Sequence, residues 1–174
     1  MQEKNNDLTG KIKKIKCLVM DADGVLTDGT ITLDNNGHEI KSFNVYDGLG
    51  IDMWHKAGFK TAIVSGRQSE ALKHRAKELK INLLIDGIND KVGQLDKIEN
   101  KLSIDKGEIA FVGDDINDLK IMQQAGLSIA VSNARDLIKD NAELIADAPG
   151  GNGAIREIIE YLLNKKGLLD SILK

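Results

Sequence analysis

Two carboxylates stand close together in the segment DADGVLTDG at 21–29, which overlaps the end of the apolar run IKCLVMD. Asp21 and Asp23 are two residues apart, so an extended backbone directs both side chains to the same side, and Gly24 permits a sharp turn straight after them. Converging carboxylates repel each other unless a proton or a cation joins them, and oxygen-rich sites of this kind suit Mg²⁺. We therefore expect a magnesium site here; the alternative is an ordinary Asp-Gly turn with solvated acids.

A second acidic segment, GDDIND at 113–118, also follows an apolar run. Asp114 ends that run as Asp21 ends the first, so it is the best candidate for a further metal ligand. Asp115 and Asp118 stand at the start of an expected helix, where an acidic side chain caps the backbone or compensates the helix dipole. Their roles stay open between capping and catalysis.

Two further segments suit an anion. In VSGR at 64–67, the Ser65 hydroxyl and the backbone N–H groups around Gly66 form a cradle for phosphate oxygens between a strand and a helix. Arg67 is either a substrate contact or a surface charge. Lys91 is expected at a helix start, where its charge opposes the helix dipole. That placement makes sense if Lys91 faces an anionic cluster, although most lysines are solvated surface residues.

Short apolar runs alternate with helical patterns along the chain, which predicts an α/β fold: a doubly wound parallel sheet covered by helices on both faces. The expected strands are 15–21, 61–66, 83–86, 109–114, 128–131 and 144–146, and the expected helices are 48–57, 69–79, 90–102, 115–125, 134–140 and 153–165. Such sheets bind ligands at the carboxyl ends of their strands, which is where both acidic segments and the Ser-Gly turn stand.

One segment, 29–45, interrupts this alternation. A DNNG turn signal lies there between two short strand-like runs, which predicts a β-hairpin inserted after the first strand. The end of the chain, 167–174, is a short apolar tail beyond the last long helix. Four apolar positions of the hairpin segment have no obvious cover within the chain: Ile31, Leu33, Phe43 and Val45.

The composition fits one globular domain, residues 1–174, with a mass of 19.0 kDa. A net charge of −3 and an aromatic content of 3% argue against a nucleic-acid partner. No uninterrupted hydrophobic run exceeds four residues, so no membrane span is expected, and the amino terminus lacks the apolar stretch of a signal peptide. The single cysteine, Cys17, cannot form an internal disulfide and fits a reducing compartment. We therefore expect a cytoplasmic protein.

The order of these segments, DxD, then serine, lysine and the acidic pair, resembles that of the haloacid dehalogenase superfamily of phosphatases. The resemblance implies that Asp21 is a nucleophile that forms an aspartyl-phosphate and that Asp23 is a general acid and base. It also implies phosphate binding by Ser65, Gly66 and Lys91, and a Mg²⁺ site made by Asp21, Asp114 and the backbone carbonyl of Asp23.

A narrower resemblance rests on DxDGVLTDG, the hairpin in place of a cap domain, NVYDGLGI at 44–51, VSGR, Asp90–Lys91, GDDIND and GGNGAIREI at 150–158. This set is similar to the sugar-acid phosphatases that hydrolyse 3-deoxy-D-manno-octulosonate 8-phosphate for lipopolysaccharide synthesis. It favours Arg67 as a bidentate partner of the sugar-acid carboxylate. The alternatives are a phosphatase for a nine-carbon ulosonate 9-phosphate, a non-catalytic oligomerisation domain, and a receiver domain.

The hairpin also predicts an assembly, because an isolated two-stranded ribbon is marginally stable in water and closed symmetry favours small even numbers of subunits. The resembling phosphatases are tetramers built around such hairpins. We therefore expect a homotetramer in which hairpins, and the tail at 167–174, complete neighbouring active sites.

Overall fold

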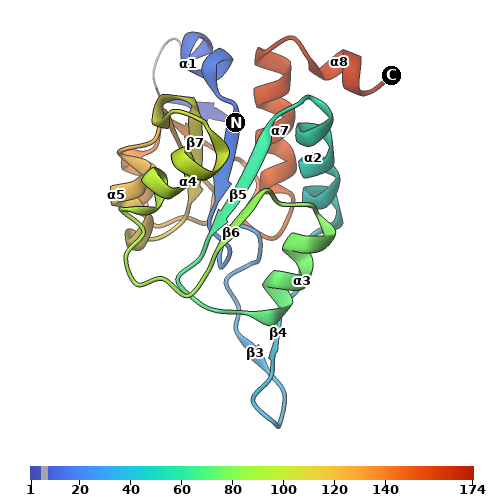
Figure 1. Ribbon diagram of the computed structural model, residues 1–174, viewed down its shortest axis with the longest axis vertical. Helices are drawn as coiled ribbons and strands as arrows, with labels where there is room; N and C mark the ends of the chain where they lie inside the picture. The colour runs from blue at the N-terminus through green and yellow to red at the C-terminus, as the bar shows by residue number, and fades with distance from the viewer. Residues whose placement is uncertain (5–7) are drawn as a thin grey trace.

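A mostly parallel β-sheet forms the centre of the computed structural model, which describes residues 1–4 and 8–174 (Figure 1). Among these residues the sheet has seven strands in the order β1-β9-β8-β7-β2-β5-β6, and only β1 runs antiparallel to its neighbour, β9. The bounds of the strands are β1 Gln2–Glu3, β2 Cys17–Met20, β5 Lys60–Val64, β6 Leu83–Ile85, β7 Ile109–Gly113, β8 Leu127–Ala130 and β9 Leu144–Ile145.

The central strand, β2, shows why continuous apolar runs predict strands in this fold. All four of its residues are buried, and it pairs in parallel with β5 on one side and β7 on the other. Its Val19 stands opposite Ala62 and Phe111. A strand buried on both faces needs continuous rather than alternating apolar residues, and all six predicted strands are confirmed.

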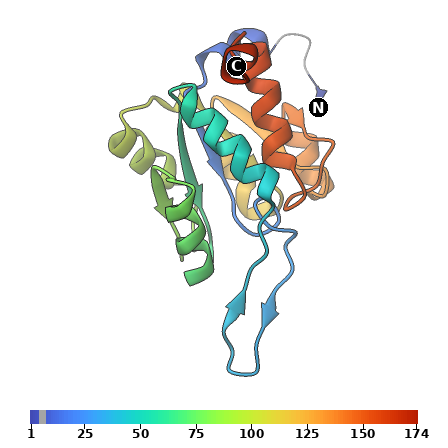
Figure 2. The same cartoon turned by 90° about the vertical axis from the view of Figure 1, so that its right-hand side faces the viewer.

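Helices cover both faces of the sheet, with α2, α3 and α7 on one side and α4 and α5 on the other (Figures 1 and 2). Their bounds are α2 Val45–Lys56, α3 Glu70–Glu78, α4 Gln94–Leu102, α5 Leu119–Met122, α6 Asp136–Asn141 and α7 Ala154–Lys165. The doubly wound class is therefore confirmed. No helix in the described ranges is long and apolar enough to cross a membrane.

Several helix boundaries differ from the predicted ones. Helix α2 begins earlier because the Asn44 side chain caps it, accepting a hydrogen bond from the Tyr46 N–H at 2.8 Å. Helix α4 begins at Gln94 rather than at 90. The segment 115–125 is a 3-10 turn, η2 Ile116–Asp118, followed by the short α5. The prediction also missed α1 Thr9–Lys14, η1 Lys106–Glu108 and α8 Leu169–Ile172.

The predicted hairpin projects from the end of the domain where β2 and β5 terminate (Figure 2). Its strands, β3 Thr32–Leu33 and β4 Glu39–Ile40, are short and pair antiparallel. The turn between them is closed by Asp34, whose Oδ1 accepts hydrogen bonds from the backbone of Asn36 and His38, both at 2.8 Å. The apolar side chains of this ribbon are exposed: Ile31 55%, Leu33 59% and Ile40 54%.

Two residues expected on the hairpin behave differently. Phe43 packs partly buried against the core and lies 5.8 Å beneath the Arg75 guanidinium, so it has the cover within the chain that the sequence did not reveal. Val45 is the first residue of α2, not of a strand, and is 73% exposed.

The tail lies at the opposite end of the domain from the hairpin (Figure 1). Leu168, Leu169 and Ile172 pack against the core, while Leu173 is exposed. Just before the tail, the Lys166 ammonium donates to the carbonyl of Ile15 at 2.6 Å, two residues before β2 begins. Within its own subunit the tail is therefore remote from the carboxyl ends of the strands.

Candidate active site

A cavity of about 270 Å³ opens at the carboxyl ends of the central strands. The loops after β2, β5, β6 and β7 all contribute to its lining, as expected for a ligand site in an open α/β sheet. All seven residues that the sequence singled out line this cavity: Asp21, Asp23, Ser65, Gly66, Arg67, Lys91 and Asp114. It is also lined by Gly29, Asp115, Asn117 and Asp118.

A buried ammonium joins two of the carboxylates. The Lys91 Nζ atom lies 2.8 Å from Asp21 Oδ1 and 2.7 Å from Asp118 Oδ1. Burial lowers the pKa of Lys91, but the two carboxylates outweigh that effect and raise it, so the ammonium stays charged. Lys91 lies in the loop before α4 and not inside a helix; it does face the anionic cluster that its predicted position required.

Asp21, the candidate nucleophile, has a pKa above its ordinary value. Burial and the neighbouring charge of Asp118 raise the pKa of Asp21 to about 6, against the opposing effect of Lys91. Asp114 is affected in the same direction: burial and the charges of Asp21, Asp118 and Asp115 raise its pKa to about 7. Burial is the largest cause of both shifts, and the neighbouring carboxylates, which outnumber the single ammonium of Lys91, add to it.

This excess charge fits a divalent cation. Carboxylate oxygens of Asp21, Asp114 and Asp118 all lie within 4.8 Å of one another. The Oδ1 atom of Asp114 is buried and has no hydrogen-bond partner among the described residues. A buried carboxylate oxygen without a partner is costly unless a cation or water meets it, and hard oxygen ligands suit Mg²⁺.

The geometry can be compared with the predicted set of magnesium ligands. It brings Asp21 and Asp114 together as expected and places Asp118 beside them. The side chain of Asp23 contacts Lys41 of the hairpin. The backbone carbonyl of Asp23 stays a predicted ligand. Gly24 matters here because a Cβ at this position would lie 2.1 Å from Asp114 Oδ2, so only glycine lets Asp114 approach the loop.

The capping interpretation of the second acidic segment is correct for both residues. Asp115 Oδ1 accepts a hydrogen bond from the Ile116 N–H at 2.7 Å. Asp118 Oδ2 accepts one from the Asp115 N–H at 3.5 Å and another from the Asp114 N–H at 3.0 Å. Asp118 is 1% exposed and also holds Lys91, so one carboxylate fixes both the loop that carries Asp114 and the ammonium beside Asp21.

The Ser-Gly turn, which the sequence predicts as a phosphate cradle, lies directly after β5. Ser65 is buried, and its Oγ accepts a hydrogen bond from the Arg67 N–H at 3.3 Å. Arg67 itself is half exposed, and its guanidinium lies 2.7 Å from Glu39 Oε1 and 3.7 Å from Asp23 Oδ2. Arg67 is therefore at the mouth of the site.

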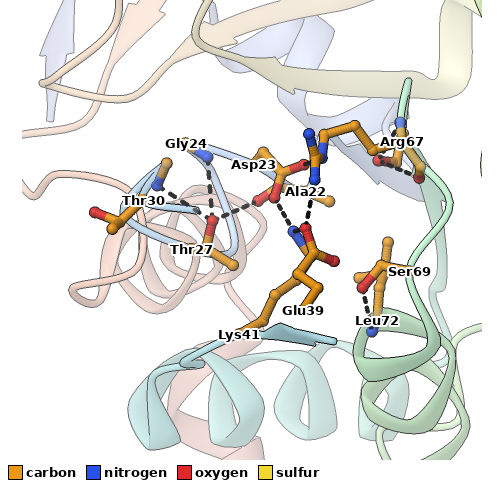
Figure 3. Close-up of polar contacts among 12 residues, drawn as sticks. Ala22, Asp23, Gly24, Thr27, Thr30, Glu39, Lys41, Arg67, Ser69 and Leu72 are labelled. Atoms are coloured by element: carbon orange, nitrogen blue, oxygen red, sulfur yellow. Dashed lines mark hydrogen bonds and ion pairs between the residues drawn. The ribbon is translucent and has the colours of Figure 1, made fainter. Parts of the chain in front are cut away.

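The hairpin contributes two residues that the sequence analysis missed (Figure 3). The Lys41 ammonium contacts Asp23 Oδ1 directly and lies 3.2 Å from Glu39 Oε1. Glu39 and Lys41 are two residues apart on one face of the ribbon. The sequence could have indicated this pair, because alternation along a strand places Glu39 and Lys41, which have opposite charges, on the face away from Ile40.

The glycine-rich stretch before α7 supports the Asp21 loop from behind. The Gly150 N–H donates to Asn133 Oδ1 at 2.7 Å, and the amide of Asn133 donates to the Gly24 carbonyl at 3.3 Å. A third contact joins the same segments, from the Gly151 N–H to the Val25 carbonyl at 3.0 Å. These bonds bring the carboxy-terminal glycines against DADGVLTDG, which lies more than 120 residues earlier in the chain.

A larger cavity, of about 580 Å³, lies elsewhere, beside α1 and the turn after α5. Two of its charged side chains are paired with neighbours: Lys11 with Glu143 at 2.5 Å and Glu108 with Lys16 at 2.6 Å. Size alone does not make a catalytic site, and the clustered carboxylates and buried lysine are in the smaller cavity.

Comparison with known proteins agrees with this geometry. The sequence profile of the haloacid dehalogenase-like hydrolases matches residues 84–158. The 3-deoxy-D-manno-octulosonate 8-phosphate phosphatase KdsC of Escherichia coli K12 is 38% identical over 164 residues, which are 94% of this chain and 87% of that protein. This chain belongs to the haloacid dehalogenase-like hydrolases.

Other relatives within this hydrolase family are equally similar. KdsC of Salmonella typhimurium is 39% identical over 92% of this chain and 85% of its own length. The crystal structure of the octulosonate 8-phosphate phosphatase from Moraxella catarrhalis, in complex with a magnesium ion, a phosphate ion and KDO, superposes with a TM-score of 0.92. Its identity is 38%, and the alignment covers 95% of both chains. A cobalt-bound phosphatase from Haemophilus influenzae superposes with a TM-score of 0.90 at 35% identity, covering 94% of this chain and 99% of that one.

Proposed function

We propose that this protein is a Mg²⁺-dependent phosphomonoesterase that hydrolyses 3-deoxy-D-manno-octulosonate 8-phosphate to the free sugar acid and phosphate. The observation that carries the proposal is the Asp21–Lys91–Asp118 cluster beside Asp114, in a chain 38% identical to KdsC over nearly its whole length. With this substrate, the reaction provides a precursor of lipopolysaccharide, and the protein works in the cytoplasm.

In the first chemical step an Asp21 carboxylate oxygen attacks phosphorus, a P–O bond forms, and the bond to the C8 oxygen of the sugar breaks. Asp23 gives its proton to the departing alkoxide, so the sugar leaves as an alcohol. In the second step water attacks the aspartyl-phosphate, the ionised Asp23 accepts the proton of that water, and the bond between Asp21 and phosphorus breaks. Covalent catalysis thus divides one difficult hydrolysis into two easier steps.

The remaining site residues bind and orient the phosphoryl group. The Ser65 hydroxyl and the N–H groups around Gly66 would hold its oxygens, and Lys91 supplies a fixed positive charge between Asp21 and Asp118. Mg²⁺ would be held by Asp21, Asp114 and the backbone carbonyl of Asp23, while Asp118 keeps its contact with Lys91. When bound, the ion reduces the repulsion between the anionic nucleophile and the anionic ester.

Arg67 is proposed to select a carboxylated substrate. It is half exposed at the mouth of the cavity, and its fork of N–H donors suits a sugar-acid carboxylate. A nine-carbon ulosonate 9-phosphate carries the same carboxylate, so it is the alternative substrate that the assay must include.

A homotetramer is proposed on the exposed apolar surface of the hairpin and the start of α2. Ile31, Leu33 and Ile40 are each more than half exposed, and so are Val45 and Tyr46. Joining ribbons from several subunits would cover these side chains. Light scattering at micromolar concentration is expected to give four times 19.0 kDa, and a fully active monomer would reject the assembly. If the tail completes a neighbouring site, deletion of 167–174 lowers turnover.

Phosphate release by the purified protein tests the proposed function. We expect rapid release from octulosonate 8-phosphate, slower release from the nine-carbon ester and from neutral hexose phosphates, and loss of all activity with EDTA. Asp21→Asn should abolish turnover while circular dichroism shows a folded protein. Failure of the wild-type protein to hydrolyse any ester would favour the non-catalytic alternative.

A further inference from the structure

The hairpin residue Lys41 lies where a positioning residue for Asp23 would have to lie. We propose that Lys41 holds the Asp23 carboxyl in the orientation that delivers a proton to the leaving alkoxide, and that the hairpin therefore serves the active site of its own subunit. This inference rests on the proposed function, because it assigns Asp23 the role of general acid and base.

The contacts of Lys41 are the first argument. Its ammonium contacts Asp23 Oδ1 and lies 3.2 Å from Glu39 Oε1, and both partners are carboxylates (Figure 3). Asp23 lies on the loop after β2 and Glu39 on β4, so Lys41 joins the catalytic loop to the hairpin across 18 residues of sequence. A general acid works only if its carboxyl is within reach of the departing oxygen in the right orientation.

The burial of Lys41 is the second argument. Its side chain is only 2% exposed, although the ribbon around it is largely solvated. A lysine on a short edge ribbon is ordinarily a solvated charge that prevents unwanted strand pairing. Burying an ammonium is unfavourable unless carboxylates and hydrogen bonds compensate it. Lys41 meets that condition only because the hairpin is folded against Asp23.

Glu39 completes the arrangement by linking Lys41 to Arg67. One oxygen, Oε1, lies 3.2 Å from Lys41 Nζ and 2.7 Å from an Arg67 nitrogen. Burial raises the pKa of Glu39, but hydrogen bonds from Ser69, Arg67 and Lys41 outweigh it and hold the pKa at about 2. The chain Asp23–Lys41–Glu39–Arg67 thus alternates in charge, and its two end members line the cavity.

The alternative is that Lys41 only anchors the hairpin to the domain. The choice of leaving group in the substrate distinguishes these two hypotheses. An alkyl phosphate needs a proton on its departing oxygen, whereas p-nitrophenyl phosphate releases a stable phenolate without one. The value of kcat/KM reports the steps up to departure of this group. A misplaced Asp23 should therefore slow the alkyl ester selectively, while a loosened site should slow both esters alike.

The experiment compares the wild-type protein with Lys41→Met on propyl phosphate and on p-nitrophenyl phosphate, with Mg²⁺ present. Neither ester carries a carboxylate, so loss of a contact between Arg67 and a substrate carboxylate does not enter the comparison. We expect kcat/KM for propyl phosphate to fall by about 10- to 100-fold and that for p-nitrophenyl phosphate by less than threefold. Lys41→Arg should recover part of the loss. The matched control is Lys56→Met, a solvent-exposed lysine paired with Asp52, which should behave as wild type.

A second measurement tests the contact without turnover. Protons on a buried, paired ammonium exchange slowly, so the Lys41 side chain should give a ¹H–¹⁵N signal that Asp23→Asn shifts or removes. If Lys41→Met folds poorly, Lys41→Gln replaces it in the kinetic comparison.

The outcomes separate the two hypotheses. Equal losses on both esters, or no loss on either, in an active protein would overturn the role of Lys41 and leave the phosphatase proposal intact. A wild-type protein inactive on every ester would overturn the phosphatase proposal and the catalytic role of Lys41 with it. The ammonium signal would then still show whether the ion pair exists.

Discussion

The substitution Gly150→Ala should impair catalysis without touching any reacting group. A Cβ at position 150 would lie 1.8 Å from the Gly24 carbonyl oxygen, whereas real Cβ contacts are essentially never closer than 3.0 Å. The two backbones must therefore separate by at least 1.2 Å, the difference between those distances. Gly24 directly follows Asp23, so the displacement falls on the catalytic loop.

The magnitude follows from that displacement. A misplacement of about 1 Å can cost about 10²-fold in rate, and overpacking of a tight contact costs about 1–3 kcal/mol of stability. We expect kcat/KM for the sugar-acid phosphate to fall by about 10²-fold and the midpoint of urea unfolding to fall measurably. Steady-state phosphate release and urea titration are the assays.

Gly107→Ala is the matched control, because a Cβ there meets nothing within 4 Å. It should retain wild-type turnover and stability. If Gly150→Ala kept its rate within threefold of wild type, the close approach of the two glycine segments would not be what places Asp23, and the reasoning would fail.

The other predictions concern charge. Lys91→Met leaves Asp21 and Asp118 buried without their cation, so the free energy of unfolding without metal should fall by about 3–5 kcal/mol. Added Mg²⁺ should stabilise this variant more than it stabilises the wild-type protein. Equal stabilisation of both proteins in urea titrations would contradict the view that Lys91 and Mg²⁺ neutralise the same carboxylates. Arg67→Ala should raise KM for the octulosonate ester more than for p-nitrophenyl phosphate, and parallel increases would mean that Arg67 serves the phosphate or the hairpin. The pKa of Glu39 is depressed to about 2 from 4.5, so its stabilising effect is complete above pH 4.5 and is lost as the pH falls towards 2; it amounts to at most about 3 kcal/mol. Glu39→Gln should therefore lose less stability than wild type between pH 6 and pH 3, and parallel curves would exclude that linkage.

Much of this architecture was predictable because the physics that forms it is local in sequence. Strands such as β2 and β7 are buried on both faces and appear as continuous apolar runs. Their carboxyl ends meet at one edge of the sheet, so the sequence alone predicts that Asp21 and Asp114 lie together.

The missed elements depend on distant partners. Strand β1 is two polar residues, Gln2–Glu3, and exists only by pairing with Leu144–Ile145. Helix α1 is rich in lysine and buries Ile12 alone, which gives almost no periodic signal. Lys41 has the same difficulty: on its ribbon it looks solvated, and only the folding of the hairpin against Asp23 reveals that it is buried.

The adjacency of β2 and β7 also determines when the site can first exist during folding. Val19 pairs with Ala62 of β5 and with Phe111 of β7, which comes much later in the chain. A partly folded domain holding only β2, β5 and β6 would present Asp21, Ser65 and Lys91 but neither Asp114 nor Asp118. Non-local strand pairing of this kind closes long loops and is slow. Recovery of enzymatic activity during refolding should therefore lag behind recovery of helical signal, and it reports the moment at which the two halves of the sheet join.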